Sequence, residues 1–112
     1  MNTKNKVYAQ GDILFVPINN IPENIKVLER NGGAIVLAEG EVTGHFHKIQ
    51  TPEIGAWINE KDDIFIEVRN LIAEVTHNEH NTVALPKGNY KVVKQRQYQQ
   101  GKFQSNIQPV QD

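Results

Sequence analysis

The sequence contains no cysteine, only one serine and no apolar run of membrane-spanning length. The lack of cysteine excludes disulfides, thiolate zinc sites and a cysteine nucleophile. Residues 1–10 lack the apolar core of a signal peptide, so we expect a cytoplasmic protein with no membrane partner. A chain of 112 residues, 38% of them hydrophobic, predicts one small domain with a thin core. A metal or a second subunit could complete such a core.

Helical periodicity is nearly absent, whereas short alternating apolar segments recur along the chain. This pattern predicts an all-β domain over residues 1–112, a small closed or partly open antiparallel β-barrel, with a β-sandwich as the alternative. Asn31, Gly32 and Gly33 predict a hairpin turn after a short strand, and Lys61, Asp62 and Asp63 predict another turn. The expected strands are 13–17, which ends at Pro17, 26–30, 34–40, 41–49, 55–59, 64–68, 71–76, 82–85 and 89–98, followed by a partly extended C-terminal tail, 99–112.

The formal charge of −1 hides two regions of opposite sign. Residues 1–80 hold seven Lys/Arg and twelve Asp/Glu, a balance of −5, whereas residues 81–112 hold five and one, a balance of +4. Basic and aromatic residues interleave in the second region, as in surfaces that contact phosphates and bases, although a solvated charged face is the alternative. The predicted phosphate-binding residues are Lys87, Lys91, Lys94 and Arg96, and the predicted base-stacking residues are Tyr90 and Tyr98.

All four histidines lie in two short motifs, GHFH at 44–47 and HNEH at 77–80. Alternation along strand 41–49 sends its acidic, hydroxyl and imidazole side chains to one face. We expect the two motifs to converge on one pocket, although solvent-exposed histidines without a function are the alternative. The predicted catalytic residues are His45, His47, His77 and His80, with Glu41, Thr43 and Glu79 orienting the imidazoles.

Three functions fit these residues. In the first, a metal-independent phosphodiesterase or ribonuclease with no cofactor, one imidazole removes a proton from a 2′-hydroxyl or water and another protonates the leaving 5′-oxygen. In the second, the four histidines bind one divalent transition metal. That site partly resembles a cupin, because Gly40 precedes the His-x-His pair and Pro86-Lys87-Gly88 has the Pro-x-Gly form, but no histidine follows Gly88. The third is a noncatalytic module that binds or sequesters nucleotides.

The runs LAEGEVTGH-x-H (37–47), H-x-EH (77–80), ALP-x-G-x-Y-x-V (84–92) and Q-R-x-Y (95–98) resemble a family of small bacterial and phage proteins. The paired histidines on a small β-barrel also resemble ring nucleases, which degrade the cyclic oligoadenylate messengers of type III CRISPR defence. This resemblance implies a homodimer whose pocket matches the symmetry of a cyclic ligand. The expected partner is a small cyclic or linear oligonucleotide and not duplex DNA, and we expect Trp57 or the C-terminal strand at the dimer interface.

Overall fold

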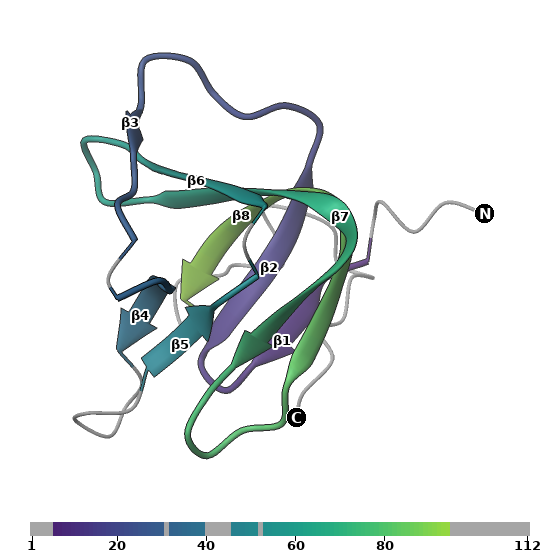
Figure 1. The fold of residues 1–112 in the computed structure, drawn as a ribbon. Helices are drawn as coiled ribbons and strands as arrows, with labels where there is room; N and C mark the ends of the chain where they lie inside the picture. Colours follow the sequence, from purple (N-terminus) through teal and green to yellow (C-terminus); the bar gives the residue numbers. More distant parts are fainter. Residues whose placement is uncertain (1–5, 31, 40–45, 52, 95–112) are drawn as a thin grey trace.

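The computed structural model describes residues 6–30, 32–39, 46–51 and 53–94, which form one antiparallel sheet rolled into a partly open barrel (Figure 1). The all-β prediction is confirmed, and within these residues no helix is long and apolar enough to cross a membrane. The strands are β1 (Tyr8–Gln10), β2 (Ile13–Ile18), β3 (Lys26–Val27), β4 (Ile35–Glu39), β5 (Phe46–Ile49), β6 (Ile54–Ile58), β7 (Ile64–Thr76) and β8 (Val83–Lys94).

The barrel is built around the two longest strands, β7 and β8, which pair along most of their lengths. Strand order is β1-β2-β8-β7-β5-β4, with β6 also on β7 and β3 on β6. The β7–β8 register shifts between Val68 and Ile72, opposite Pro86 and Gly88, and both strands bend there (Figure 1). The predicted breaks at 69–70 and at Pro86 are therefore wrong. An irregular ladder tolerates a proline, which has no N–H to donate, so the strand continues through Pro86.

Two further predictions about strand ends and turns are wrong. β2 does not end at Pro17 but continues to Ile18, with Pro17 opposite Tyr90. The segments flanking Gly32 and Gly33 do not form a hairpin, because β3 pairs with β6 and β4 pairs with β5. Both glycines do have positive φ, 62° and 85°, so the turn forms without pairing of its flanks. β3 has only two residues, and they pair with Trp57 and Ile58 of β6 instead.

The predicted turn at 61–63 is confirmed. Asn59 Oδ1 accepts hydrogen bonds from the backbone N–H groups of Lys61 and Asp63, at 2.8 and 2.9 Å. Asp62 has a positive φ of 67°. This local bonding joins β6 to β7 and aligns Ile58 with Ile64.

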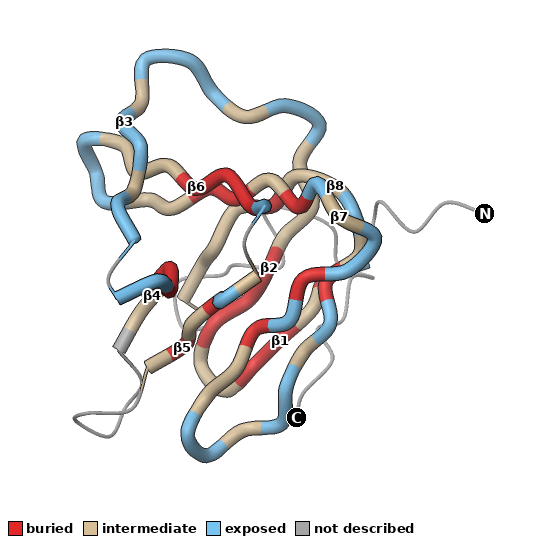
Figure 2. Tube along the Cα trace, in the orientation of Figure 1, coloured by how far each residue is buried: buried red, intermediate tan, exposed pale blue. Residues whose placement is uncertain are grey.

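The buried residues lie mainly on the strands, and the exposed ones mainly on the connections (Figure 2). The main core includes Ile13, Phe15, Ile35, Leu37, Ile49, Ile66, Val68, Val75, Leu85 and Tyr90. A smaller cluster of Val7, Ala9 and Leu14 lies where β1 packs on β2, a strand that the sequence did not predict. The connection between β1 and β2 is the two-residue turn Gly11–Asp12, which carries part of the candidate site. The predicted tail, 99–112, lies outside the described residues.

Candidate active site

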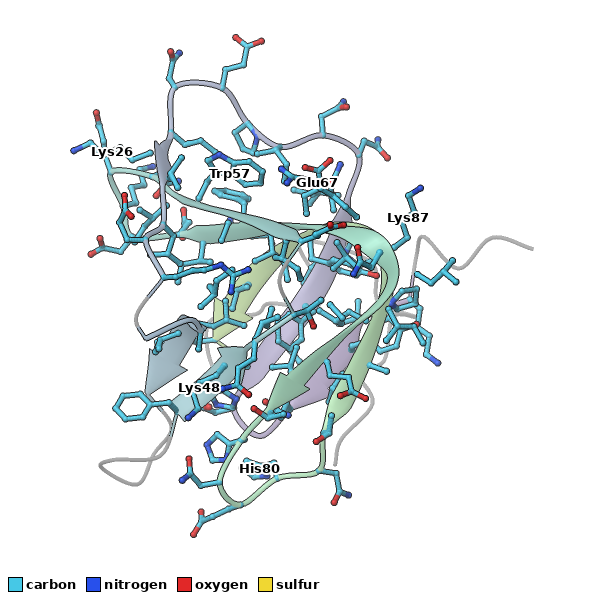
Figure 3. The ribbon with its side chains drawn as sticks, viewed as in Figure 1. Lys26, Lys48, Trp57, Glu67, His80 and Lys87 are labelled. Atoms are coloured by element: carbon cyan, nitrogen blue, oxygen red, sulfur yellow. The ribbon has the colours of Figure 1, made fainter. Side chains whose placement is uncertain are left out.

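Three histidine rings meet at one end of the barrel. His47 comes from β5, and His77 and His80 come from the loop between β7 and β8. The ring centroids lie 4.3 Å apart for His47 and His77, 4.6 Å for His77 and His80, and 6.4 Å for His47 and His80. Figure 3 shows His80 at the same end of the molecule as Lys48 of β5. The two sequence motifs therefore converge, as predicted, through these three residues, which we call the histidine cluster.

His47 forms the buried base of the cluster, with no exposed side-chain surface. Its ring nitrogens face two different side chains: Nδ1 lies 2.9 Å from Gln10 Oε1, and Nε2 lies 3.2 Å from Asp12 Oδ1. Both partners flank Gly11 at the β1–β2 turn. Their contacts with His47 place this turn beside β5. His47 can therefore reach a ligand only through the other members of the cluster.

The Gln10 amide determines which nitrogen of His47 carries the proton. Gln10 Nε2 donates to two backbone carbonyls, those of Val75 at 2.8 Å and Asn81 at 2.9 Å. A flipped amide would turn its oxygen toward both carbonyls, so Oε1 must face His47. Since Oε1 only accepts, the proton of neutral His47 lies on Nδ1. The lone pair of Nε2 then points toward the Asp12 carboxylate.

Burial, and to a smaller extent the neighbouring imidazoles, His77 more than His80, lower the pKa of His47 from 6.5 to about 4. Asp12 opposes this shift by its hydrogen bond and its charge. The ring is therefore neutral at pH 7, while its hydrogen-bond partners would suit an imidazolium. His47 is the point in the cluster where bonding favours a proton and desolvation disfavours one.

His77 and His80 lie on the solvent side and are each partly exposed. The backbone N–H of Glu79 donates to His77 Nδ1 at 3.0 Å, so neutral His77 carries its proton on Nε2, the opposite tautomer to His47. Glu79 was expected to orient an imidazole. It contacts the His77 ring through its main-chain N–H group. His80 lies over Gly11, where a Cβ would come within 2.5 Å of His80 Nε2. Glycine at position 11, with φ of 58°, lets the imidazole approach the turn this closely.

The predicted phosphate-binding lysines do not lie together. Figure 3 shows Lys87 well away from His80, at the bend of β8. Lys87 lines a small cavity of about 180 Å³ with Tyr90, whose ring is only 5% exposed and whose hydroxyl donates to the Pro86 carbonyl at 2.7 Å. Lys91 lies on β8 opposite Val16 and Phe65. Tyr90 therefore packs in the core and bonds across the bend.

Lys94 is the predicted lysine that lies nearest the histidine cluster along the sheet. It is opposite Ile13, the residue that follows Asp12. Together with Lys61 it lines a cavity of about 240 Å³ that also touches Ala38, the cross-strand neighbour of His47. Asp62 and Asp63 line the same cavity, and the Asp63 carboxylate accepts a bond from Asn59. We call this space between β4 and β8 the lysine cavity.

Five predicted site residues lie outside the described residues: Glu41, Thr43, His45, Arg96 and Tyr98. Conversely, the sequence analysis missed Gln10 and Asp12, the two side chains that hold His47. Their only signal was two polar residues flanking a glycine directly before an apolar strand. A turn of that kind is common, and nothing local shows that it packs against a histidine 35 residues later.

The described residues offer little support for a cupin-like metal site. Within them, no group of three or more His, Asp or Glu side chains is arranged to hold a metal ion. The ring faces of the histidine cluster pack against one another, and His77 Nδ1 is used by a backbone N–H. Pro86 and Gly88 lie at the bend of β8, so this Pro-x-Gly sequence forms a corner of the barrel.

Neither the curated proteins nor the solved structures contain a match to this chain. One family model matches, over residues 9–95, and it is described as a domain of unknown function, DUF8820. The match spans all the described strands except the first residue of β1, and includes the whole histidine cluster with Gln10 and Asp12. The chain belongs to the DUF8820 family.

Proposed function

We propose that the protein is a metal-independent phosphodiesterase that cleaves small oligonucleotides by histidine acid/base chemistry. The observation that carries this proposal is the convergence of His47, His77 and His80, with different hydrogen-bond partners for His47 and His77. A cluster of one buried and two partly exposed imidazoles contributes little to a core that is already small. Proton transfer is the chemistry that such a cluster performs near neutral pH.

Acid/base cleavage needs a proton acceptor and a proton donor at the same pH. Grouped imidazoles meet this need when their environments separate their proton affinities, because repulsion prevents all of them from charging together. Burial keeps His47 neutral at pH 7. The partly exposed His77 and His80 are then the candidates to contact substrate, with His80 the better one because a backbone N–H already occupies His77 Nδ1.

The lysine cavity supports a phosphate-bearing substrate. Lys61 and Lys94 line it, and it borders both Ile13, next to Asp12, and Ala38, opposite His47. A volume of about 240 Å³ is below the range of about 300–1,000 Å³ that is typical of small-molecule pockets, so the cavity would take one phosphate group and part of its nucleotide. In this proposal the cavity holds a phosphate group while His80 works on the bond beside it. Cyclic and linear oligoadenylates are the first substrates to examine.

The test is incubation of the protein with cyclic and linear oligoadenylates and mixed-sequence oligoribonucleotides, with and without EDTA. We expect cleavage that EDTA does not reduce, with products ending in a 2′,3′-cyclic phosphate if the 2′-hydroxyl attacks. Metal analysis of the same sample should show less than one equivalent of transition metal. Binding without cleavage would contradict the proposal and favour a sequestering module. Cleavage that EDTA abolishes would contradict it in favour of a metalloenzyme.

The site is tested by His80→Gln, with Lys26→Ala as a control for general effects of substitution. Lys26 is exposed on β3 and lies at the opposite end of the molecule from His80 (Figure 3). We expect His80→Gln to reduce kcat by about 10²-fold or more, the usual contribution of a general acid or base. The Lys26→Ala variant should keep wild-type activity.

A further inference from the structure

We infer that Gln10 and Asp12 are positioning residues of the histidine cluster, which fix the proton of His47 on Nδ1 and hold its Nε2 ready to accept a second proton. This inference rests on the proposed function and adds two residues and a protonation state to it. It follows from a count of donors and acceptors around one buried ring.

Two arrangements of one proton on His47 are possible, and the surroundings separate them. With the proton on Nδ1, Gln10 keeps its three hydrogen bonds, to His47, Val75 and Asn81. With the proton on Nε2, the ring donates to Asp12, but Nδ1 and Gln10 Oε1 become two facing acceptors. If the Gln10 amide were flipped, its Nε2 would donate to His47 Nδ1, but its oxygen would then face the carbonyl oxygens of Val75 and Asn81. The first arrangement leaves one fully buried group, His47 Nε2, facing an acceptor, because the Asp12 side chain is 23% exposed and can bond to water, whereas the second leaves two, His47 Nδ1 and Gln10 Oε1.

The first arrangement leaves Nε2 and Asp12 Oδ1 3.2 Å apart with no proton between them. A second proton placed there would complete every hydrogen bond around the ring and form a charge-assisted pair. Burial and the nearby imidazoles oppose that proton. Hydrogen bonding to Asp12 thus raises the pKa of His47, whereas burial lowers it. Asp12 is the group that makes proton uptake by His47 feasible.

The charged and titratable groups around His47 define what this arrangement does for the reaction. Asp12 approaches from the β1–β2 turn, His77 and His80 from the β7–β8 loop, where the exposed Glu79 also lies, and Lys48 is the next residue on β5. When an outer imidazole takes a proton from substrate, a neutral His47 adds no repulsion, and the Asp12 carboxylate behind it attracts the new charge. A different imidazole donates its proton to the leaving 5′-oxygen, and proton exchange with water then returns both rings to their starting states.

The protonation state is measured by long-range ¹H–¹⁵N correlation on protein labelled with ¹⁵N-histidine, with His47 assigned by the loss of its signals in His47→Gln. At pH 7 we expect the proton on Nδ1 and a bare Nε2. A proton on Nε2 would overturn the inference. This measurement does not depend on turnover, so absence of cleavage by the wild type would refute the proposed function while the spectrum still decides the tautomer.

The roles of the two residues are tested by Asp12→Asn and Gln10→Leu. Asp12→Asn removes the charge that favours the imidazolium, so the pKa of His47 should fall, and kcat should drop on the order of 10- to 100-fold with little change in KM. Gln10→Leu removes the acceptor of the Nδ1 proton, so the proton of neutral His47 should move to Nε2, where it can bond to Asp12.

Two matched controls change the same chemical groups elsewhere. Glu23→Gln removes an exposed carboxylate from the connection between β2 and β3, and Gln50→Leu alters an exposed residue after β5. Both controls should keep the wild-type spectrum and pH profile. If Asp12→Asn also left the titration of His47 and kcat unchanged, the positioning role would be refuted, because a purely structural contact would not move either quantity.

Discussion

The residue that most distinguishes this molecule is His47, a fully buried histidine whose ring nitrogens both face polar side chains. Such a ring is costly to bury and is retained where its orientation or its proton matters. His47 was predicted as a site residue from its motif alone. The motif could not show that the ring is buried, because period-two alternation gives the face of a strand but not what covers that face.

The shifted pKa of His47 predicts how stability depends on pH. In the unfolded chain the imidazole takes up a proton near pH 6.5, but in the folded protein only near pH 4. Between these values the unfolded state binds more protons, so the free energy of unfolding falls as the pH is lowered through this window. The full loss from this group is about 3 kcal/mol at 1.36 kcal/mol for each pKa unit. Urea unfolding at a series of pH values measures it.

The control for that prediction compares two histidines. His47→Gln should remove most of the decline between pH 6.5 and pH 4, while His80→Gln should keep it. A wild-type protein whose unfolding free energy rises toward pH 4 would show that His47 is charged when folded, contrary to the burial seen here.

The contact of His80 with Gly11 gives a second prediction at the residue scale. Alanine at position 11 would place a methyl group 2.5 Å from His80 Nε2 and force the ring to move. Gly32→Ala is the matched control, because its φ of 62° is close to the 58° of Gly11 and its position is open. Both variants should lose about 1–2 kcal/mol of stability from the left-handed backbone. Only Gly11→Ala should also lose cleavage activity, and equal activities would contradict the assigned place of His80.

At the scale of elements, the strands were largely predictable and their joins were not. Alternating apolar residues correctly gave all-β structure and the turn at 61–63, because both depend on neighbours in the sequence. Pairing depends on distant residues, so the sequence suggested a hairpin at Gly32 and Gly33 that β3 does not make. Likewise Pro86 indicated a strand end, whereas the bend of β7 accommodates it.

The turn between β6 and β7 gives a prediction at this scale. Asn59 Oδ1 accepts two backbone N–H groups, so Asn59→Ala leaves both without this partner. We expect a loss of about 1–2 kcal/mol in the free energy of unfolding. Asn59→Asp combined with Asp63→Asn keeps an oxygen at the same place and reverses the direction of the hydrogen bond between the two side chains, so it should restore most of the stability. Denaturant unfolding of the two variants decides the point, and an equal loss in both would refute the role of the oxygen.

For the whole molecule, the homodimer remains a prediction. The exposed apolar residues indicate which surface would form its interface. Val27 is 64% exposed and pairs with Trp57, the residue expected at the interface. Leu71 is 85% exposed at the bend of β7 and serves as a control. We expect a dimer by sedimentation velocity that Val27→Glu dissociates and Leu71→Glu leaves intact. A monomeric wild type, or dissociation by Leu71→Glu alone, would contradict this assignment.

The whole barrel also explains why the charge pattern was only a partial guide to the site. The basic region of the sequence runs along β8, and the bend of that strand carries Lys87 away from His80 while the end of the strand brings Lys94 opposite Ile13. A linear count of charge cannot separate these two lysines, because their positions depend on the bend. We therefore expect Lys94, and not Lys87, to affect substrate binding.

We propose that the histidine cluster performs acid/base cleavage. The pH dependence of cleavage in the presence of EDTA examines this proposal directly. The measurement is the single-turnover rate on a cyclic oligoadenylate, for wild type and His80→Gln, from pH 4 to pH 9. The account predicts a bell-shaped wild-type profile, which requires one acid and one base, and a His80→Gln rate lower by about 10²-fold or more that lacks one limb. Equal rates and profiles for the two proteins would contradict it.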